Sequence, residues 1–311
     1  MKGQLRFDGQ VAIVTGAGRG VGRAHAELLA ARGAAVVVND IGFSPSGSGE
    51  KSSGPADEVV SAIKAAGGRA VASYDDASTA EGCQHMVELA LEHFGGIHML
   101  IANAGTIELK LFGDITEADF DFQMRQHVNG CFNATKAVWP HFAQNKYGRI
   151  VLTTSGIGYF GFEKQLSYGA AKGAIHGMMR TLALEGAPLN IAVNAFWPSA
   201  FTRMVGGDAN EELKARMQRN SPASLAAPVA VWLTHGDCPL TGEVLHGGSG
   251  RASRVFVAET RGYYQPGLTL EDVAENQQSV LQEDGYFVFR CAADSSVAQA
   301  KILEEYNANN S

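Results

Sequence analysis

The chain has 311 residues but only four cysteines, and their spacing argues against two kinds of small fold. The four lie far apart and form no C-x-x-C pair, so neither a zinc knuckle nor a disulfide framework is indicated. The nine histidines show no H-x-x-x-H spacing and no carboxylates in a metal-binding pattern. We therefore expect no metal site, and a reducing compartment such as the cytoplasm fits best.

The chain also lacks a basic excess and long apolar runs. Its 25 Lys and Arg residues face 32 Asp and Glu residues, giving a formal charge of −7 and no attraction toward nucleic acid or anionic lipid. No apolar run approaches the ~18–20 residues that span a bilayer, and residues 1–9 lack the apolar core of a signal peptide. The last residues, Asn309-Asn310-Ser311, do not form a peroxisomal SKL signal. We expect no nucleic-acid partner, no membrane insertion and no export.

What the sequence does contain is a regular alternation of short β-branched runs with longer alanine-rich stretches of helical period. This alternation predicts βαβ units with buried parallel strands, an α/β fold. The expected strands are Val11–Val14, Ala35–Asn39, Arg69–Ser73, Met99–Ala102, Gly148–Thr153, Ile191–Phe196 and a possible last one near Glu243–His246. The expected helices are Gly22–Arg32, Pro55–Ala66, Ala80–Phe94, Glu117–Val138, Ser167–Glu185 and Glu211–Arg219.

Two stretches interrupt this alternation. Gly42–Gly54 is rich in Gly, Ser and Pro and indicates a surface loop. After about Gly250 the alternation ends, although Thr269 can cap a short helix and Ser295–Tyr306 has helical period. We therefore expect a catalytic domain over residues 1–250 and a C-terminal extension over residues 251–311.

A glycine-rich turn follows the first expected strand. It reads Thr15-Gly16-Ala17-Gly18-Arg19-Gly20-Val21-Gly22 and opens a helix. Glycines at such a junction let the backbone approach a pyrophosphate, and the helix N-terminus supplies unpaired N–H groups. A glycine cluster alone can also be a tight turn, but its place between a strand and a helix favours dinucleotide binding.

Asp40 ends the second expected strand, where an acidic residue accepts hydrogen bonds from adenosine ribose hydroxyls. A carboxylate there repels a 2′-phosphate, so we predict NAD over NADP. Arg19 is a nearby cation that could tolerate the phosphorylated form, and Asp40 could also be only a polar strand end. Asp75 and Asn103 follow the next two strands, at the sheet edge where such folds bind ligands; each alone could be a helix cap or turn.

The catalytic candidates lie around Tyr168 and Lys172. These two residues are four apart, so in a helix their side chains are neighbours. An ammonium beside a phenol, with the positive charge of an oxidised nicotinamide, favours the phenolate and makes Tyr168 a base. Ser155 ends the fifth strand and could donate to a substrate oxygen. Asn129 could hold a water that extends the proton path from Lys172, although a mid-helix amide is often only a buried polar residue.

These motifs resemble those of the short-chain dehydrogenase/reductase family over roughly residues 5–250. The resemblance implies a Rossmann-type doubly wound parallel sheet with helices on both faces. It also implies a catalytic tetrad in which Tyr168 is the acid/base, Ser155 orients the oxygen, Lys172 binds ribose and tunes Tyr168, and Asn129 supports the relay. The cofactor residues it implies are Gly16, Gly18, Arg19, Gly20, Val21, Gly22, Asp40, Asp75, Asn103, Ala104, Gly105, Tyr168, Lys172, Pro198 and Thr202.

A narrower resemblance is to the 3-hydroxyacyl-CoA dehydrogenase domain of peroxisomal multifunctional enzyme type 2, also called a 17-beta-hydroxysteroid dehydrogenase. The segments that carry it include Val38-Asn39-Asp40 with its long loop, Pro198–Met204 and Ala227–Leu233. The chain departs from this pattern because it carries neither a hydratase nor a sterol-carrier domain, and because Trp197-Pro198-Ser199 stands where the wider family often has Pro-Gly.

Two classes of function stay open. The first is an NAD-dependent dehydrogenase of a hydrophobic secondary alcohol, such as a 3-hydroxyacyl-CoA or a hydroxysteroid, or a reductase of another small carbonyl compound. The second is a non-catalytic nucleotide-binding module on the same fold. Aromatic residues after Ser155 and near Phe196 favour an apolar substrate. The family resemblance also implies a homodimer or homotetramer.

Overall fold

The computed structural model describes residues 3–42, 52–201 and 211–309. The chain divides into two compact units, Met1–Arg254 and Val255–Ser311. The first unit contains the sheet except for its last residue, Val255, and the expected site residues that the structure describes. Within the described residues, no helix is both long enough and apolar enough to cross a membrane.

The first unit is built on an eight-stranded sheet of order β3-β2-β1-β4-β5-β6-β7-β8. Its pairs from β3 through β7 are parallel, which confirms the predicted fold class. The strands are β1 Val11–Thr15, β2 Ala35–Asn39, β3 Arg69–Ser73, β4 Met99–Ala102, β5 Gly148–Thr153, β6 Ile191–Pro198, β7 Val244–Gly248 and β8 Arg251–Val255. Residues in β1, β2, β4 and β5 are buried throughout, as expected for strands covered on both faces.

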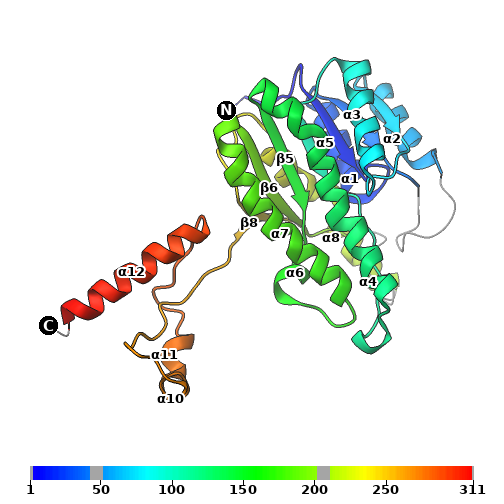
Figure 1. Ribbon diagram of the computed structural model, residues 1–311. Coiled ribbons are helices and arrows are strands. Elements are labelled where there is room, and N and C mark those ends of the chain that lie inside the picture. The colour runs from blue at the N-terminus through cyan, green and yellow to red at the C-terminus, as the bar shows by residue number, and fades with distance from the viewer. Residues whose placement is uncertain (1–2, 43–51, 202–210, 310–311) are drawn as a thin grey trace. The chain divides into compact units, whose positions relative to one another are not determined.

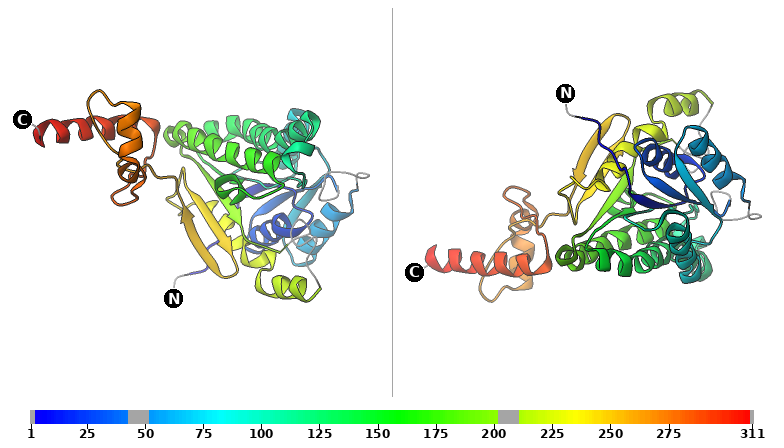
Figure 2. Two further views of the ribbon diagram at one scale, coloured as in Figure 1. Left: turned by 90° about the horizontal axis from the view of Figure 1, so that it is seen from below. Right: turned by 90° about the horizontal axis from the view of Figure 1, so that it is seen from above.

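Helices cover both faces of this sheet (Figures 1 and 2). Helices α1, α2 and α9 pack together on one face, while α3 and α5 pack together on the other. The helices of the first unit are α1 Gly20–Ala31, α2 Gly54–Ala65, α3 Ala80–Phe94, α4 Glu117–Met124, α5 Gly130–Asn145, α6 Ile157–Phe160, α7 Leu166–Gly186, α8 Glu211–Asn220 and α9 Ala227–Leu233.

The strand register brings the carboxyl ends of the strands to one edge. Thr15 pairs with Asn39, and Asn39 pairs with Ser73. On the other side of β1, the chain crosses over to β4, so the connections after β1 and β4 diverge. A crevice forms where connections diverge in this way, and ligands of open α/β sheets bind there.

The structure differs from the sequence-based expectation in the middle of the chain. The sequence predicts one helix over Glu117–Val138, but the structure has α4, a π-helical segment Arg125–Asn129, and then α5. A π turn holds an extra residue, which changes the face that later side chains present. Such short irregularities leave no periodic signal, so the sequence could not reveal this one.

The sequence also misses α6, α9 and β8. Helices α6 and α9 are too short to show a clear period. Strand β8 is mostly exposed at the edge of the sheet, so it lacks an apolar pattern. The two residues that connect it to β7, Ser249 and Gly250, both have positive φ, which is typical of a tight β-hairpin turn.

The second unit is mainly helical, with α10 Leu270–Glu275, α11 Gln277–Leu281 and α12 Ala292–Asn309 (Figure 1). The expected cap of α10 is confirmed. The Thr269 hydroxyl accepts a hydrogen bond from the Asp272 N–H at 3.1 Å, and the Thr269 N–H donates to the Asp272 carboxylate at 2.9 Å. This reciprocal pair satisfies two N–H groups at the start of the helix.

Candidate active site

A cavity of about 1340 Å³ lies at the carboxyl edge of the sheet. It exceeds the ~300–1,000 Å³ of an ordinary ligand pocket, as expected for a site that holds both a dinucleotide and a substrate. The expected cofactor and catalytic residues that line it are Gly16, Gly18, Arg19, Gly20, Val21, Asp40, Asp75, Asn103, Ala104, Gly105, Ser155, Tyr168, Lys172 and Pro198. Thr202 lies outside the described residues.

The glycine-rich turn has the backbone that phosphate binding requires. Gly16 and Gly20 have φ of 61° and 54°, in the left-handed region that favours glycine. Arg19 precedes α1 and its side chain does not cap the helix, so the first N–H groups of α1 are open toward a ligand. Gly22 does not line the cavity; a Cβ there would collide with the carbonyl oxygen of Gly16. Gly22 therefore permits close packing of helix and turn.

Asp40 joins this turn to the end of β2. Its carboxylate accepts hydrogen bonds from the Gly18 N–H at 2.9 Å and from the Gly42 N–H at 2.8 Å. A Cβ on Gly18 would overlap the same carboxylate, so only glycine lets the turn approach it. A carboxylate has about four lone-pair positions, which leaves room to accept ribose hydroxyls as well.

Asn103 links the ends of β4 and β1. Its Nδ2 donates to the carbonyl oxygens of Thr15 and Gly16 at 3.1 and 3.2 Å. The Thr15 hydroxyl in turn accepts from the N–H groups of Asn103 and Ala104 at 2.9 and 3.0 Å. These bonds hold the crevice between the two strands in one geometry before any ligand arrives.

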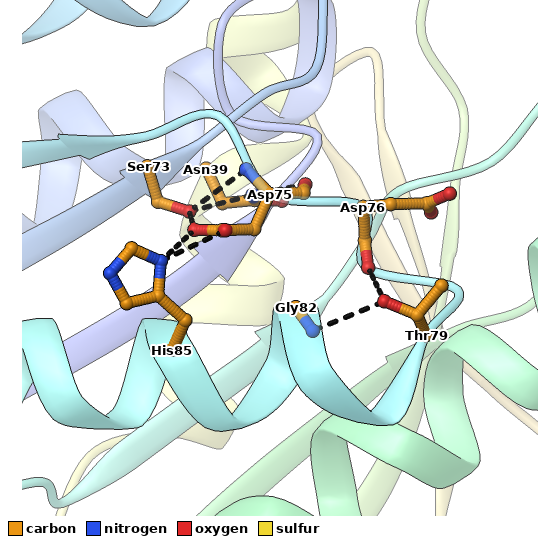
Figure 3. A network of polar contacts seen from close by, with 7 residues as sticks. All are labelled: Asn39, Ser73, Asp75, Asp76, Thr79, Gly82 and His85. Atoms are coloured by element: carbon orange, nitrogen blue, oxygen red, sulfur yellow. Dashed lines mark hydrogen bonds and ion pairs between the residues drawn. The ribbon is translucent and has the colours of Figure 1, made fainter.

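Asp75, at the end of β3, is held from three sides (Figure 3). The Ser73 hydroxyl donates to its carboxylate at 2.7 Å, and the Asn39 Nδ2 donates to its carbonyl oxygen at 2.9 Å. His85, from α3, places Nδ1 at 2.9 Å from the carboxylate, and this contact raises the pKa of His85. Nearby, the Gly82 N–H donates to Thr79, which caps α3. Asp75 is therefore fixed within the cavity wall.

The catalytic candidates meet at the ends of β5 and α7. Lys172 is 3% exposed, and its Nζ donates to the Thr153 carbonyl oxygen at 2.7 Å. The same Nζ lies 5.6 Å from the centre of the Tyr168 ring. Ser155 lies just beyond β5 and lines the same cavity. The structure thus brings Ser155, Tyr168 and Lys172 together, as the sequence predicts.

Burial dominates the titration of these groups. Burial raises the pKa of the Tyr168 phenol, and the neighbouring Ser155 hydroxyl opposes that shift. Burial also lowers the pKa of Lys172 to about 8. The expected lowering of the phenol pKa by Lys172 is therefore not the leading influence in the protein itself, because desolvation penalises both charged forms. A bound oxidised nicotinamide would add a positive charge that favours the phenolate.

Asn129 requires a correction, because the structure does not bring it into the cavity. Its side chain is exposed and does not line the site. His127, two residues earlier, is 1% exposed and does line it. Residues two apart on a helix face in nearly opposite directions, so only one of this pair can point inward. The geometry supports no relay role for Asn129.

His127 is the functional residue that sequence reasoning misses. Its ring packs edge-to-face against Tyr168, with ring centres 5.2 Å apart. Its Nε2 lies 2.8 Å from the Thr106 carbonyl oxygen, and Gln123 donates to the Thr106 hydroxyl at 3.3 Å. A Cβ on Gly105 would overlap the His127 ring, so that glycine allows the approach. Burial and the charge of Lys172 keep the pKa of His127 well below its usual value, so the ring is neutral.

The site fits a nicotinamide dinucleotide. A Cβ at Gly16 would collide with the backbone of Ala104 and one at Gly18 with Asp40, so these glycines let the turn pack against the neighbouring strand ends. The open N-terminus of α1 suits a pyrophosphate. Asp40 offers a carboxylate to ligand hydroxyl groups and Lys172 offers an ammonium donor, and both line the same cavity. Within the described residues, no group of three or more His, Cys, Asp or Glu side chains is arranged to hold a metal ion.

Comparisons with known proteins agree with this geometry. The family model of short chain dehydrogenases matches residues 10–213. Peroxisomal multifunctional enzyme A of Dictyostelium discoideum is 39% identical over 280 residues, covering 90% of this chain and 62% of that protein. The structure of full-length peroxisomal multifunctional enzyme type 2 from Drosophila melanogaster superposes with a TM-score of 0.79 at 30% identity, covering 97% of this chain and 50% of that one.

A smaller protein also matches. The crystal structure of a short chain dehydrogenase from Mycobacterium avium gives a TM-score of 0.74 at 31% identity, covering 88% of this chain and 96% of that one. The present chain spans less than two thirds of the length of the two peroxisomal enzymes. The family match extends over more than half of the chain and includes the glycine turn, Asp40, Ser155, Tyr168 and Lys172. The chain therefore belongs to the short-chain dehydrogenase/reductase family, whose members are oxidoreductases that use a nicotinamide cofactor.

Proposed function

We propose that the chain is an NAD-dependent dehydrogenase that interconverts a hydrophobic secondary alcohol and its ketone. The observation that carries this proposal is a single cavity lined both by the dinucleotide-binding residues and by Ser155, Tyr168 and Lys172. A module that only bound nucleotides would not need a buried lysine beside a buried phenol, because burial of both costs free energy.

The residues around the reacting carbon have separate tasks. When bound, the oxidised nicotinamide accepts the hydride that leaves the carbinol carbon. The Tyr168 phenolate oxygen takes the proton of the substrate hydroxyl, and the Ser155 hydroxyl donates to the same substrate oxygen. Lys172, anchored on the Thr153 carbonyl, places its ammonium beside the phenol and favours the phenolate. In the reverse direction Tyr168 returns the proton.

Preference for NAD rests on Asp40. Its carboxylate lines the cavity next to the glycine turn and is held there by Gly18 and Gly42. A 2′-phosphate would lie against this negative charge, at a cost of several kcal/mol when desolvated. Arg19 also lines the cavity, and it is the residue most able to offset that repulsion.

An apolar substrate is supported by the other end of the cavity. Ile107, Leu109, Ile157, Phe162 and Phe201 contribute to its wall there. Such a lining suits the acyl chain of a 3-hydroxyacyl-CoA or the rings of a hydroxysteroid. The names of the Dictyostelium and Drosophila relatives describe those enzymes as peroxisomal. For the present chain we propose a cytoplasmic location.

We extend the proposal to the organisation of the chain. Residues 1–250 form the catalytic domain and residues 251–311 a C-terminal extension, in keeping with the two compact units. We also propose a homodimer or homotetramer, since long helices such as α5 and α7 offer the faces that two-fold interfaces use.

The experiment that tests the proposed function is a substrate panel. Purified protein with NAD is offered 3-hydroxyacyl-CoA esters of short and long chain, hydroxysteroids and simple secondary alcohols, and NADH formation is followed by absorbance. We expect turnover of at least one apolar alcohol with NAD and much less with NADP. Tight NAD binding without oxidation of any alcohol would instead favour the non-catalytic module.

A further inference from the structure

The imidazole of His85 contacts a residue of the cavity wall but is not itself part of that wall. His85 lies on α3, and Asp75, which lines the cavity, comes shortly after β3. The His85 Nδ1 lies 2.9 and 3.0 Å from the two carboxylate oxygens of Asp75 (Figure 3). An ionised carboxylate only accepts hydrogen bonds, so Nδ1 carries the proton. The chemistry proposed above gives this pair no task.

The first turn of α3 sets the position of this imidazole. The Thr79 hydroxyl accepts from the Gly82 N–H at 3.1 Å and donates to the Asp76 carbonyl oxygen at 2.9 Å, which ties the helix to the segment after β3. A Cβ on Gly82 would collide with the same carbonyl oxygen, so glycine permits the close approach. His85 follows Gly82 by three residues and lies on the same face of the helix, toward Asp75 (Figure 3).

The other contacts of Asp75 hold its backbone and one carboxylate oxygen. The Asn39 Nδ2 donates to the Asp75 carbonyl oxygen at 2.9 Å and to the Ser73 hydroxyl at 3.0 Å. The Ser73 hydroxyl donates to Asp75 Oδ2 at 2.7 Å. A hydrogen bond to one oxygen leaves the carboxylate able to turn, whereas the imidazole contacts both oxygens and fixes their plane. The orientation of the Asp75 carboxylate therefore depends on His85.

The strand order indicates which group of a dinucleotide meets Asp75. Strands β1, β2 and β3 are neighbours in the sheet, and the glycine turn, Asp40 and Asp75 follow their carboxyl ends in that order. All three line one cavity, and neighbouring strands lie about 4.8 Å apart. With the pyrophosphate at the turn and the ribose at Asp40, we expect the adenine at Asp75. The adenine amino group is a donor, and the carboxylate is an acceptor.

We propose that His85 is a positioning residue for recognition of the cofactor base: it fixes the Asp75 carboxylate so that this group accepts a hydrogen bond from the amino group of adenine. The inference rests on the proposed binding of NAD and deepens it, because it makes base selection depend on a residue outside the cavity wall. Hypoxanthine carries an oxygen in place of that amino group, so it places a second acceptor against the carboxylate. A site built to hydrogen-bond one ligand group discriminates against analogues that lack it.

The test compares NAD with nicotinamide hypoxanthine dinucleotide. The affinities of both are measured by calorimetry for the wild type, Asp75→Ala, His85→Leu and His85→Asn. Leucine at position 85 removes the donor, whereas the amide of asparagine offers an N–H near the position of Nδ1 without a charge. His93→Leu, at an exposed position of the same helix, is the matched control.

We expect the wild type and His93→Leu to bind NAD about tenfold more tightly than the hypoxanthine dinucleotide, the effect of one hydrogen bond to a charged acceptor. Asp75→Ala should show no preference. In His85→Leu the preference should fall to about twofold, and His85→Asn should keep most of it. The melting temperature of His85→Leu should stay close to that of the wild type, because an exposed ion pair contributes little to stability.

The inference is overturned if the wild type shows no preference, or if Asp75→Ala or His85→Leu keeps the preference of the wild type. It is also overturned if His85→Asn loses as much of the preference as His85→Leu, because the donor would then not be what matters. In turnover with NAD, His85→Leu should raise KM for NAD and leave kcat unchanged, since the base lies at the other end of the dinucleotide from the nicotinamide. A fall in kcat alone would contradict the assigned role.

Binding and turnover together separate this inference from the proposed function. If the wild type prefers NAD to the hypoxanthine dinucleotide and His85→Leu does not, but no alcohol is oxidised, the dehydrogenase proposal fails and the role of His85 stands. If alcohols are oxidised with NAD but His85→Leu keeps the base preference of the wild type, the dehydrogenase proposal stands and the role of His85 fails.

Discussion

The cofactor side and the substrate side of the cavity satisfy their polar groups in different ways. On the cofactor side, Asp40, Asn103 and Asp75 are each bonded to backbone or side-chain groups of the protein. On the catalytic and substrate side, buried atoms of His127 and Gln165 have no partner within the described residues. The polar groups of the first side are paired within the protein, whereas these two atoms of the second side are not.

This difference in pairing indicates which residues contribute to cofactor affinity and which to substrate selection. A preorganised cofactor site loses little entropy when the dinucleotide binds, so its residues govern affinity for the cofactor. We expect unpaired groups on the other side to gain hydrogen bonds only from a ligand, and therefore to affect catalysis and substrate selection more than cofactor affinity. Substitutions on the two sides should therefore change different measured quantities.

We expect Tyr168→Phe to give the largest difference between its effect on turnover and its effect on NAD affinity. It removes the acid/base hydroxyl but keeps the ring that packs on His127, so turnover should fall by about 10²–10⁴-fold. Affinity for NAD should change by less than about twofold. Stopped-flow NADH formation and calorimetry of NAD binding measure the two quantities.

Tyr147→Phe is the matched control for this substitution. Tyr147 lies away from the cavity and its hydroxyl accepts a hydrogen bond from Gln10. It should keep full turnover. Appreciable turnover by Tyr168→Phe would remove the catalytic role that we assign to the phenol.

Asp40→Ala should give the opposite pattern on the cofactor side. Loss of hydrogen bonds to a charged acceptor is worth ~1.5–3 kcal/mol, so NAD affinity should fall by about 10- to 100-fold, and NADP should bind comparatively better. Asp40→Asn keeps an acceptor for Gly18 or Gly42 but loses the charge, so it should relax the discrimination with a smaller loss of NAD affinity. Titration with NADH and NADPH measures both.

Asp121, which is exposed on α4, supplies a control substitution with no effect on either cofactor. The assignment of the ribose site to Asp40 is wrong if the ratio of the two affinities is the same in the wild type and in Asp40→Ala.

The sequence predicts the cofactor side better than the substrate side for a physical reason. The glycine turn, Asp40 and Asn103 act mainly through backbone shape at strand ends, and strands and their ends leave a periodic signal. Tyr168 and Lys172 are predictable because one helical turn separates them.

His127 and Gln165 leave no such signal. Whether Asn129 or His127 faces the cavity depends on the π turn at Arg125–Asn129, a segment that packs against α7, which is distant in the sequence. The backbone of Gln165 is placed by a β-bridge to Lys110, 55 positions earlier. Contacts of this kind are fixed by the tertiary structure and not by local pattern.

His127→Phe tests whether turnover depends on the contacts of His127 with Tyr168 and Thr106. Phenylalanine keeps a ring against Tyr168 but leaves the Thr106 backbone without its partner, which should lower stability by about 1–3 kcal/mol. We expect turnover to fall by about tenfold with NAD affinity nearly unchanged. Gln123→Leu, which removes only the contact with the Thr106 hydroxyl, should have a smaller effect on both. Equal turnover in His127→Phe and wild type would show that the packing is only structural.

The smallest effect is expected from His25→Leu, which concerns an unpaired group outside the cavity. His25, on α1, is fully buried against Phe196, and neither ring nitrogen has a partner among the described residues. Burial lowers its pKa to about 3. The folded protein therefore keeps His25 neutral while the unfolded chain takes up a proton below about pH 6.5.

From this the direction of the pH effect follows. Because the unfolded chain binds a proton at His25 and the folded protein does not, the free energy of unfolding falls as the pH drops from about 6.5 toward 3, by up to ~1.4 kcal/mol per pH unit. Between pH 7.5 and 5, wild type should therefore lose about 2 kcal/mol more than His25→Leu in urea unfolding, while kinetic constants at pH 7.5 stay the same. The exposed His93→Leu should lose as much as the wild type. If His25→Leu instead altered turnover, unpaired atoms away from the cavity would also affect catalysis, and the contrast between the two sides would no longer hold.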